Sequence, residues 1–249
     1  MTQINIENID KTFSKNVALF RKFSLEILPN ERLCLFGPSG CGKTTLLNLL
    51  TGIIKPNSGD ISFSSNGNDF LTPKIGYVFQ EPRLIPWWTV EKNISIVLKN
   101  VDPKMANLLV KRILKLVLLP NYGKRYPSQI SGGEQQRVSI ARALVIKPDI
   151  LLLDEPFSHL DEFTATQLRY DLIKVLEKIK TTTIFTTHNP LEATYLANRI
   201  VVLAKNKSTT AIKKIIKIQM DVRQKKDLYR EFIFNDSMKK TVRKLFAKY

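Results

Sequence analysis

The sequence contains few cysteines and histidines, with two of each among 249 residues. Two cysteines cannot form a disulfide framework, and neither Cys34 nor Cys41 belongs to a structural zinc spacing, which suits the reducing cytosol. No apolar run approaches the roughly 20 residues that cross a bilayer. The polar start, residues 1–5, does not resemble a signal peptide. We therefore expect a chain that neither spans a membrane nor is exported.

Charge is strongly one-sided, with a formal net charge of +17. Residues 205–249 contain fourteen Lys or Arg and four acidic residues. Such an excess can indicate a nucleic-acid or anionic membrane partner, but it can also be the solvated surface of a lysine-rich protein. Because the sequence has no platform of basic and aromatic residues and no nucleic-acid motif, we expect no nucleic-acid partner.

The most informative segment is a glycine-rich loop between the apolar run 33–36 and the apolar run 46–50. Its residues are Gly37, Pro38, Ser39, Gly40, Cys41, Gly42, Lys43, Thr44 and Thr45. This strand, loop and helix pattern matches G-x-x-x-x-G-K-[ST], in which backbone N–H groups surround phosphates, Lys43 contacts the β and γ phosphates and Thr44 is a Mg²⁺ ligand. The alternative is a glycine turn with a surface lysine, and the flanking strand and helix argue against it.

A second glycine-rich segment, Ser131–Arg137, opens an apparent helix, Val138 to Val145. Ser131 is a favourable N-cap, and a helix N-terminus after paired glycines is suited to an anion. An ordinary capped helix would explain these residues alone. A domain with one phosphate loop needs only one phosphate site for its own nucleotide. We therefore infer that the second site, at Ser131, binds the nucleotide of another subunit.

The continuous apolar run Ile150–Leu153 indicates a strand buried on both faces, as in a parallel sheet. Two acids, Asp154 and Glu155, follow where such a strand ends, which is where open α/β sheets bind ligands. We expect Asp154 to hold Mg²⁺ through water and Glu155 to polarise the attacking water. A simple acidic turn before Pro156 is the alternative.

The order of these segments resembles the ATP-binding cassette (ABC) family over about residues 2–204. The resemblance implies an α/β fold, the P-loop NTPase cassette, with a mixed core sheet, an antiparallel β subdomain and a helical subdomain. It implies that Gln80 senses Mg²⁺ and the γ-phosphate, that Asp161 lies in the loop called the D-loop, and that His188 is the switch histidine. Phe13 falls where the family stacks an aromatic ring on adenine, although a core phenylalanine is the alternative.

The resemblance thus assigns three sets of residues. Those assigned to ATP are Phe13, the nine residues of the phosphate loop, Ser131, Gly132, Gly133, Gln135 and Asp161. Those assigned to catalysis are Glu155, His188 and Gln80, and those assigned to Mg²⁺ are Thr44, Gln80 and Asp154. Three positions depart from the family: His159 replaces a small residue, Asn189 an aspartate and Ile130 a leucine. None of them removes the ATPase chemistry, and we expect His159 to face solvent passively.

The domain layout follows from periodicity. Residues 1–204 form the cassette, in which alternation over 2–28 predicts antiparallel strands and residues 85–145 form the helical subdomain. Further strands are predicted at 75–79, 150–154 and 183–187, and a helix near 162–179. From Glu91 to Leu119 the spacing predicts helix with one apolar face, comprising Met105, Leu108, Leu109, Ile113, Leu116 and Val117.

Residues 205–249 are predicted to be a short basic C-terminal extension with a terminal helix. Alternation from Ile212 to Ile218 suggests a strand, and Asp236 or Ser237 would cap the last helix. The extension is too short for a substrate-sensing β domain. We expect the helix to pack on the cassette with its basic face solvated; contact with anionic lipid is the alternative.

Several features favour a transport ATPase. About 50 residues separate Gln80 from Ser131, which leaves no room for the coiled coil of DNA-repair ABC proteins. The chain has one cassette, unlike the translation type, and no membrane segments, unlike most exporters. The segment 79–94 resembles the nitrate/sulfonate/taurine importer ATPases, which implies uptake of a small solute such as nitrate, sulfonate, taurine or bicarbonate. The alternative is a non-transport ABC ATPase that acts on nucleic acid or another macromolecular complex.

An importer implies partners. These are a second ABC ATPase subunit, integral membrane permease subunits and, indirectly, a substrate-binding protein. The second ATPase subunit would be another copy of this chain, forming a homodimer, or a homologous chain. The chain would then lie peripherally at the cytoplasmic face of the cell membrane. We expect Trp87 and Trp88, adjacent aromatics in a polar loop, to contact the permease, unless one of them is a core residue.

Overall fold

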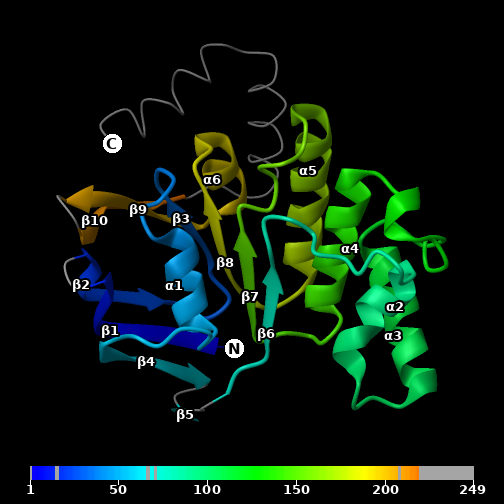
Figure 1. Cartoon of the computed structure of the whole chain (residues 1–249), viewed down its shortest axis with the longest axis horizontal. Coiled ribbons are helices and arrows are strands. Elements are labelled where there is room, and N and C mark those ends of the chain that lie inside the picture. The colour runs from blue at the N-terminus through cyan, green and yellow to red at the C-terminus, as the bar shows by residue number, and fades with distance from the viewer. Residues whose placement is uncertain (1, 15–16, 66–67, 70–71, 207–208, 219–249) are drawn as a thin grey trace. The chain divides into compact units, whose positions relative to one another are not determined.

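The computed structural model describes residues 2–14, 17–65, 68–69, 72–206 and 209–218 (Figure 1). The chain divides into two compact units, residues 1–72 with 182–249, and residues 73–181. Each unit is described by itself below. The predicted terminal helix after residue 236 lies outside the described residues.

The first unit begins with an antiparallel sheet, as the alternating pattern predicts. Its strands are β1 (Thr2–Ser14), β2 (Val17–Ile27), β4 (Ser58–Ser65) and β5 (Asn68–Asp69). Ile4 lies opposite Ile27 on one side and Phe63 on the other. Because alternate side chains of a strand share a face, Ile4 and Ile6 are both buried.

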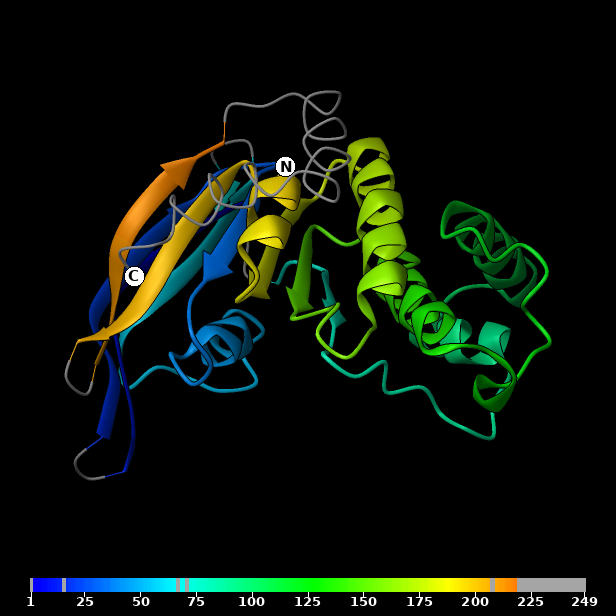
Figure 2. The ribbon, with the colours of Figure 1, turned by 90° about the horizontal axis from the view of Figure 1, so that it is seen from above.

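The rest of this unit's sheet is mixed. Its strands are β3 (Arg32–Phe36), β8 (Thr182–Thr187), β9 (Arg199–Asn206) and β10 (Thr209–Lys217). β3 is parallel to both β8 and β9, β10 is antiparallel to β9, and the order is β5-β4-β1-β2-β10-β9-β3-β8. The predicted mixed sheet is thereby confirmed. In Figure 2 these strands curve around helix α1 (Lys43–Leu50).

The predicted end of the cassette, residue 204, lies inside β9. The predicted strand near Ile212 to Ile218 is present as β10, which pairs with β9 along its whole length. A strand hydrogen-bonded into the middle of a sheet cannot be an appendage. We therefore propose that the cassette continues to residue 218.

The second unit has two parallel strands, β6 (Ile75–Val78) and β7 (Ile150–Asp154), of which β7 is entirely buried. Its helices are α2 (Val90–Ser95), the 3-10 turns η1 (Ile96–Leu98) and η2 (Pro127–Gln129), α3 (Pro103–Leu116), α4 (Gly132–Leu144) and α5 (Glu162–Lys178). Helix α4 is central and packs against β6, α2, α3 and α5. At Gly76 a Cβ atom would lie 2.5 Å from the Ala143 carbonyl oxygen, so glycine permits the close contact of β6 and α4.

The helical pattern from Glu91 to Leu119 is interrupted, contrary to the prediction of one apolar face. Asp102 caps a new helix by accepting a hydrogen bond from the Met105 N–H at 3.0 Å, and Pro103 starts it. The buried face of α3 consists of Val110, Ile113 and Leu114, and the C-cap residue Val117 is also buried. Met105 and Leu108, placed on that face by the prediction, are 48% and 41% exposed. Apolar spacing alone therefore assigned part of this face wrongly.

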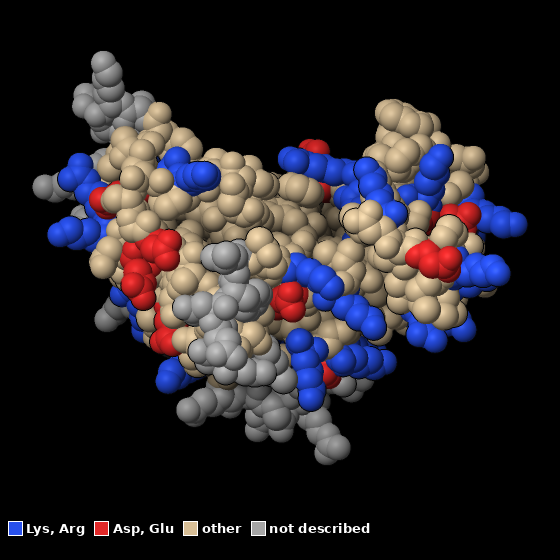
Figure 3. Space-filling view, turned by 90° about the horizontal axis from the view of Figure 1, so that it is seen from below, with Lys and Arg blue, Asp and Glu red and all other residues tan. Residues whose placement is uncertain are grey.

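Two observations agree with the composition. Within the described ranges, no helix is long and apolar enough to cross a membrane. On the face of the molecule in Figure 3, Lys and Arg side chains are clearly in excess over Asp and Glu, as the net charge of +17 leads one to expect.

Candidate nucleotide site

The phosphate loop, residues 37–45, connects β3 to α1. Gly37 has no room for a side chain, because a Cβ atom would lie 2.5 Å from the Leu203 carbonyl oxygen. Gly42 caps α1 with a φ of 93°, a conformation that favours glycine. No side chain caps α1, and its first turn contains no acidic residue. A helix start without a capping side chain or an acidic residue, together with the positive end of the helix dipole, fits an anion.

Lys43 places a positive charge within this loop. Its Nζ atom donates hydrogen bonds to the carbonyl oxygens of Gly37, at 2.9 Å, and Pro38, at 3.2 Å. The Lys43 side chain is almost fully buried, whereas Ser39 and Thr44 are exposed. These carbonyl acceptors are neutral, so the ammonium group would gain by turning towards anionic phosphate oxygens that approach from the exposed side.

Thr210 supports the loop from β10, a role that no motif or spacing in the sequence indicates. Its hydroxyl donates a 2.7 Å hydrogen bond to the carbonyl oxygen of Cys41. Both residues are buried. The contact satisfies a loop carbonyl that would otherwise be unpaired in the interior, and unpaired buried carbonyls are costly.

His188 follows the end of β8 and is exposed. The turn around it is fixed by neighbouring side chains. The Thr187 hydroxyl donates to the buried carboxylate of Glu192 and accepts from the Asn189 N–H at 3.0 Å. The Asn189 side chain in turn caps helix α6 (Pro190–Leu196) through the Leu191 N–H at 2.9 Å. These contacts hold the backbone from which His188 projects.

This strand end lies beside the phosphate loop. Thr187 is in register with Phe36, the last residue of β3, and its carbonyl oxygen accepts a 3.4 Å hydrogen bond from the Gly37 N–H. Phe13 of β1 is 60% exposed, with the Lys11 ammonium 5.2 Å from the ring centroid. The alternative of a core phenylalanine at position 13 is therefore wrong.

In the second unit, Asp154 ends β7 and is buried. The Tyr77 hydroxyl donates to one Asp154 carboxylate oxygen over a long 3.4 Å. Burial, and secondly the Asp154 carboxylate, raise the pKa of Tyr77 well above its usual range, so the phenol stays protonated as a donor. This contact orients the carboxylate predicted to hold Mg²⁺.

Glu155 adopts a left-handed backbone conformation with φ 42°. This conformation is strained for a residue with a side chain, and such strain often marks functional positions. Ser158 stabilises the turn: its hydroxyl donates to the Glu155 carbonyl oxygen at 3.0 Å and accepts from the Gln80 side-chain amide at 3.1 Å. The structure thus brings the segment of Gln80 to the segment of Glu155.

His159 is exposed, as predicted, but it does not stand alone. Its imidazole hydrogen-bonds with the backbone of Gln80, and the Glu81 carboxylate acts on it electrostatically. Partial burial lowers the pKa of His159, and these two neighbours oppose that effect. The side chain therefore lies against the residues that follow β6 and is not simply solvated.

Helix α4 begins at Gly132, within the segment that is predicted to open it. Ser131 caps it by accepting from the Glu134 N–H at 3.3 Å, while the Glu134 carboxylate accepts from the Ser131 N–H at 2.8 Å, a capping box. Glu134 also accepts a 2.7 Å hydrogen bond from the Tyr122 hydroxyl. Sequence reasoning missed Glu134, although a serine followed three residues later by glutamate is a recognised signal.

Three further residues of this region have defined contacts. A Cβ atom at Gly133 would clash with the Thr164 methyl group, so glycine allows α4 to approach α5. The Gln135 amide donates to the Pro127 carbonyl oxygen at 3.0 Å, and thus binds its own chain. Asp161 caps α5 by accepting from the Thr164 N–H at 2.9 Å, which lowers the pKa of its carboxyl. Gly132 is exposed at the helix start.

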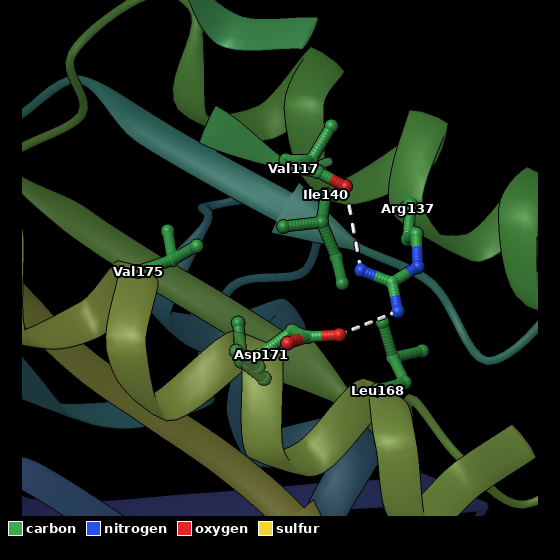
Figure 4. Close-up of a pocket in the computed structure, with 7 residues that line it drawn as sticks. Val117, Arg137, Ile140, Leu168, Asp171 and Val175 are labelled. Carbon is green, nitrogen blue, oxygen red and sulfur yellow. Dashed lines mark hydrogen bonds and ion pairs between the residues drawn. The ribbon is translucent and has the colours of Figure 1, made fainter. Parts of the chain in front are cut away.

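A small apolar pocket lies between α4 and α5, lined by Val117, Arg137, Ile140, Leu168, Asp171, Leu172 and Val175 (Figure 4). At its edge Arg137 forms a 2.7 Å ion pair with Asp171 and donates to the Val117 carbonyl oxygen at 3.3 Å. Both charged side chains are largely buried and paired. We interpret this pair as a structural connection between three helices, because its charges are satisfied within the chain.

The predicted site residues therefore fall into two sets. The first unit contains Phe13, the phosphate loop and His188, with the last two joined through Gly37 and Thr187. The second unit contains Gln80, Asp154 and Glu155 near one another, and Ser131 and Asp161 as helix caps.

Comparison with known proteins gives consistent matches. A family described as "ABC transporter" matches residues 20–158. The chain is 42% identical over 204 residues to the aliphatic sulfonates import ATP-binding protein SsuB of Bacillus cereus, covering 81% of each protein. It is 44% identical over 211 residues to a probable sulfate/thiosulfate import ATP-binding protein CysA of Chlorella vulgaris, covering 82% of this chain and 88% of that protein.

Among solved structures, the chain is similar to the dimeric ATP-binding cassette MJ0796 in a post-hydrolysis state bound to ADP and Pi. The TM-score is 0.72 at 28% identity, over 88% of this chain and 100% of that one.

Proposed function

Because this chain belongs to the ABC transporter family and is an ATP-binding ATPase subunit, we propose that it powers the import of a small anion such as a sulfonate. The observation that carries this proposal is its likeness, at above 40% identity, to import ATP-binding proteins for aliphatic sulfonates and for sulfate/thiosulfate. Both kinds of solute carry a sulfur oxyanion. The resemblance of residues 79–94 to importer ATPases points the same way.

We propose that the phosphate loop binds the β and γ phosphates of ATP, with Lys43 turning its ammonium group from loop carbonyls to phosphate oxygens. The uncapped N-terminus of α1 and the close approach at Gly37 support this assignment. Phe13, exposed on β1, would stack on the adenine. The residues also fit Mg²⁺: Thr44 offers an exposed hydroxyl and Asp154 a carboxylate oriented by Tyr77, with Gln80 as a further ligand. Bound Mg²⁺ would neutralise charge on the β and γ phosphates.

In hydrolysis we assign Glu155 to orient and deprotonate the attacking water, and His188 to contact the γ-phosphate. Two features support these roles. The strained backbone at Glu155 fixes its side chain at the end of β7, and the Thr187, Asn189 and Glu192 contacts fix the turn of His188. Most of the rate enhancement would come from positioning and charge stabilisation.

We propose that two copies act together, with Ser131 to Gly133 and Asp161 of one subunit meeting the nucleotide of the other. The likeness to a dimeric cassette supports this arrangement. The remaining partners would be membrane permease subunits, and the chain would lie at the cytoplasmic face of the membrane. We assign residues 85–145 as a helical subdomain that contacts the permease.

Reconstitution tests the proposal. The chain, its genomically adjacent permease and a binding protein would be placed in proteoliposomes, and ATP-dependent uptake of labelled taurine and sulfate measured. We expect uptake that is lost in Lys43→Ala. Failure to assemble with any permease, together with ATPase activity stimulated by nucleic acid, would overturn the proposal in favour of a non-transport ATPase.

A further inference from the structure

The loop after β6, residues 79–89, contains little regular structure, and side chains from elsewhere hold it at three points. We call this segment the Gln80 loop. At its start, Gln80 donates to Ser158 at 3.1 Å. At its end, the buried Asn93 of α2 accepts from the Ile85 N–H at 2.7 Å and donates to the carbonyl oxygens of Ile85 and Trp88, each at 3.1 Å.

The middle of the Gln80 loop is held by Arg142 of α4. Its guanidinium donates to two successive carbonyl oxygens, that of Pro82 at 2.8 Å and that of Arg83 at 2.9 Å. A planar guanidinium can direct two N–H groups at such a pair, whereas a lysine ammonium has no fixed fork. Arg142 therefore fixes both the position and the orientation of this stretch of backbone.

The backbone that Arg142 holds is strained. Arg83 has a left-handed φ of 47°, and its own guanidinium lies 4.1 Å from the centroid of the Phe79 ring. A left-handed residue with a side chain persists only when its surroundings enforce that conformation. Arg142 and Phe79 are the contacts that enforce it here.

Within the described part of the chain, the positive charge of Arg142 is not balanced by an ion pair. Among the described residues, no carboxylate pairs with it, and burial lowers the pKa of its guanidinium. Arg137 of the same helix is by contrast paired with Asp171. Arg142 is a partly buried cation that donates to two loop carbonyls. Burying a charge without an ion pair contributes little to the stability of the fold, so we interpret the side chain as holding the loop.

Helix α4 connects two functional segments of the second unit. Ser131 caps its N-terminus, and Arg142 lies eleven residues later, which corresponds to about 16 Å along the helix at 1.5 Å per residue. A displacement of the Gln80 loop would therefore act on the same rigid helix that presents Ser131.

We propose that Arg142 is a positioning residue for ATP hydrolysis: by clamping the carbonyls of Pro82 and Arg83 it holds Gln80 in place and links the Gln80 loop to the helix that carries Ser131. This inference rests on the proposed role of Gln80. It assigns no contact between Arg142 and the nucleotide.

A double-mutant cycle tests the proposal. ATPase rates are measured for wild type, Arg142→Lys, Gln80→Ala and the double variant. We expect Arg142→Lys to lower kcat roughly tenfold, the loss of one charge-assisted hydrogen bond, with little change in KM. In the Gln80→Ala background the same change should cost less than about twofold, because the residue through which it acts is absent. Equal fold losses in both backgrounds would overturn the proposal.

A matched control is Arg137→Lys on the same helix. It should lower the melting temperature and have the same fold effect on kcat in both backgrounds. If Arg137→Lys instead shows the same dependence on Gln80 as Arg142→Lys, the effect belongs to α4 in general and the specific role of Arg142 is lost. Absence of ATPase activity in the wild-type protein would contradict the proposed function. That result differs from every outcome of the cycle, which compares the rates of active variants.

Tryptophan fluorescence provides a second readout, because the only two tryptophans of the chain, Trp87 and Trp88, lie in the Gln80 loop. Arg142→Lys should increase acrylamide quenching of their emission, and Arg137→Lys should not. If Arg142→Lys does not fold, Arg142→Gln, which loses the charge and the guanidinium fork, should increase quenching in the same direction. Unchanged quenching in a folded Arg142→Lys or Arg142→Gln would contradict the clamp.

Discussion

Thr210 of β10 donates a 2.7 Å hydrogen bond to the carbonyl oxygen of Cys41, 169 residues earlier in the phosphate loop. The loop is therefore supported by a strand that the sequence placed in an extension outside the cassette. Strand β10, Thr209–Lys217, therefore belongs to the structure that shapes the candidate phosphate site.

We predict that Thr210→Val weakens ATP binding roughly five- to tenfold, because a hydrogen bond worth about 1 kcal/mol is lost and a buried carbonyl is left unpaired. Isothermal titration would measure the Kd. Thr210→Ser keeps the hydroxyl and should bind ATP as the wild type does. Unchanged affinity in Thr210→Val would show that the loop keeps its shape without this contact.

We predict that Glu155→Gln lowers ATP turnover roughly 100-fold or more, the usual effect of removing a general base. ATP should stay bound, and gel filtration with ATP should reveal a dimer. Lys43→Ala is the contrasting variant and should lose nucleotide binding itself. An ATP-loaded Glu155→Gln protein that elutes only as a monomer would argue against the shared site.

We predict that Ser131→Arg abolishes hydrolysis while the isolated subunit still binds ATP. The variant also loses the N-cap of α4, which costs about 1 kcal/mol and lowers the melting temperature by a few degrees. Ser131→Ala carries the same loss of cap without the bulky cation, and comparison of the two separates stability from steric blocking. Much weaker ATP binding by monomeric Ser131→Arg would mean that the segment acts within its own subunit.

We predict that Trp87→Glu prevents assembly with the permease but leaves basal ATPase activity and the melting temperature unchanged. Trp87 is 75% exposed, so its substitution removes no core packing. Trp88 is only partly exposed and lies 4.8 Å from the Lys92 ammonium, so Trp88→Glu should also lower stability. Pull-down with the permease and thermal melts measure both effects. Equal loss of ATPase activity and assembly in Trp87→Glu would favour a structural role.

We predict that neither thiol reacts with a maleimide in the native protein at pH 7.5. Cys34 and Cys41 are buried, and burial raises the pKa of both thiols, so the reactive thiolate is scarce at neutral pH. Raising the pH towards 10 should increase the rate of modification, and unfolding in guanidinium should make both thiols react fully. Rapid native labelling of Cys41 would show that the phosphate loop opens.

Structural features that depend on residues adjacent in sequence were predicted well. The phosphate loop, the buried strand β7 and the cap at Ser131 follow from short-range rules, because glycines, an apolar run and a serine act on their immediate backbone. The helical pattern before residue 119 was predicted less well. Periodicity marks an apolar stripe but does not identify which part of it meets a neighbour, and Met105 and Leu108 remained exposed.

The sequence by itself determined which motifs this protein carries: the phosphate-loop pattern, the carboxylates that end a buried strand, and the order of segments that identifies the family. Only the tertiary structure decided how those groups are held. Thr210 contacts Cys41, and Arg142 contacts Pro82 and Arg83, across separations of 169, 60 and 59 residues. In each case the acceptor is a backbone carbonyl. Every residue has a backbone carbonyl, so the sequence does not indicate which of them a distant donor will reach. Only the folded chain decides it.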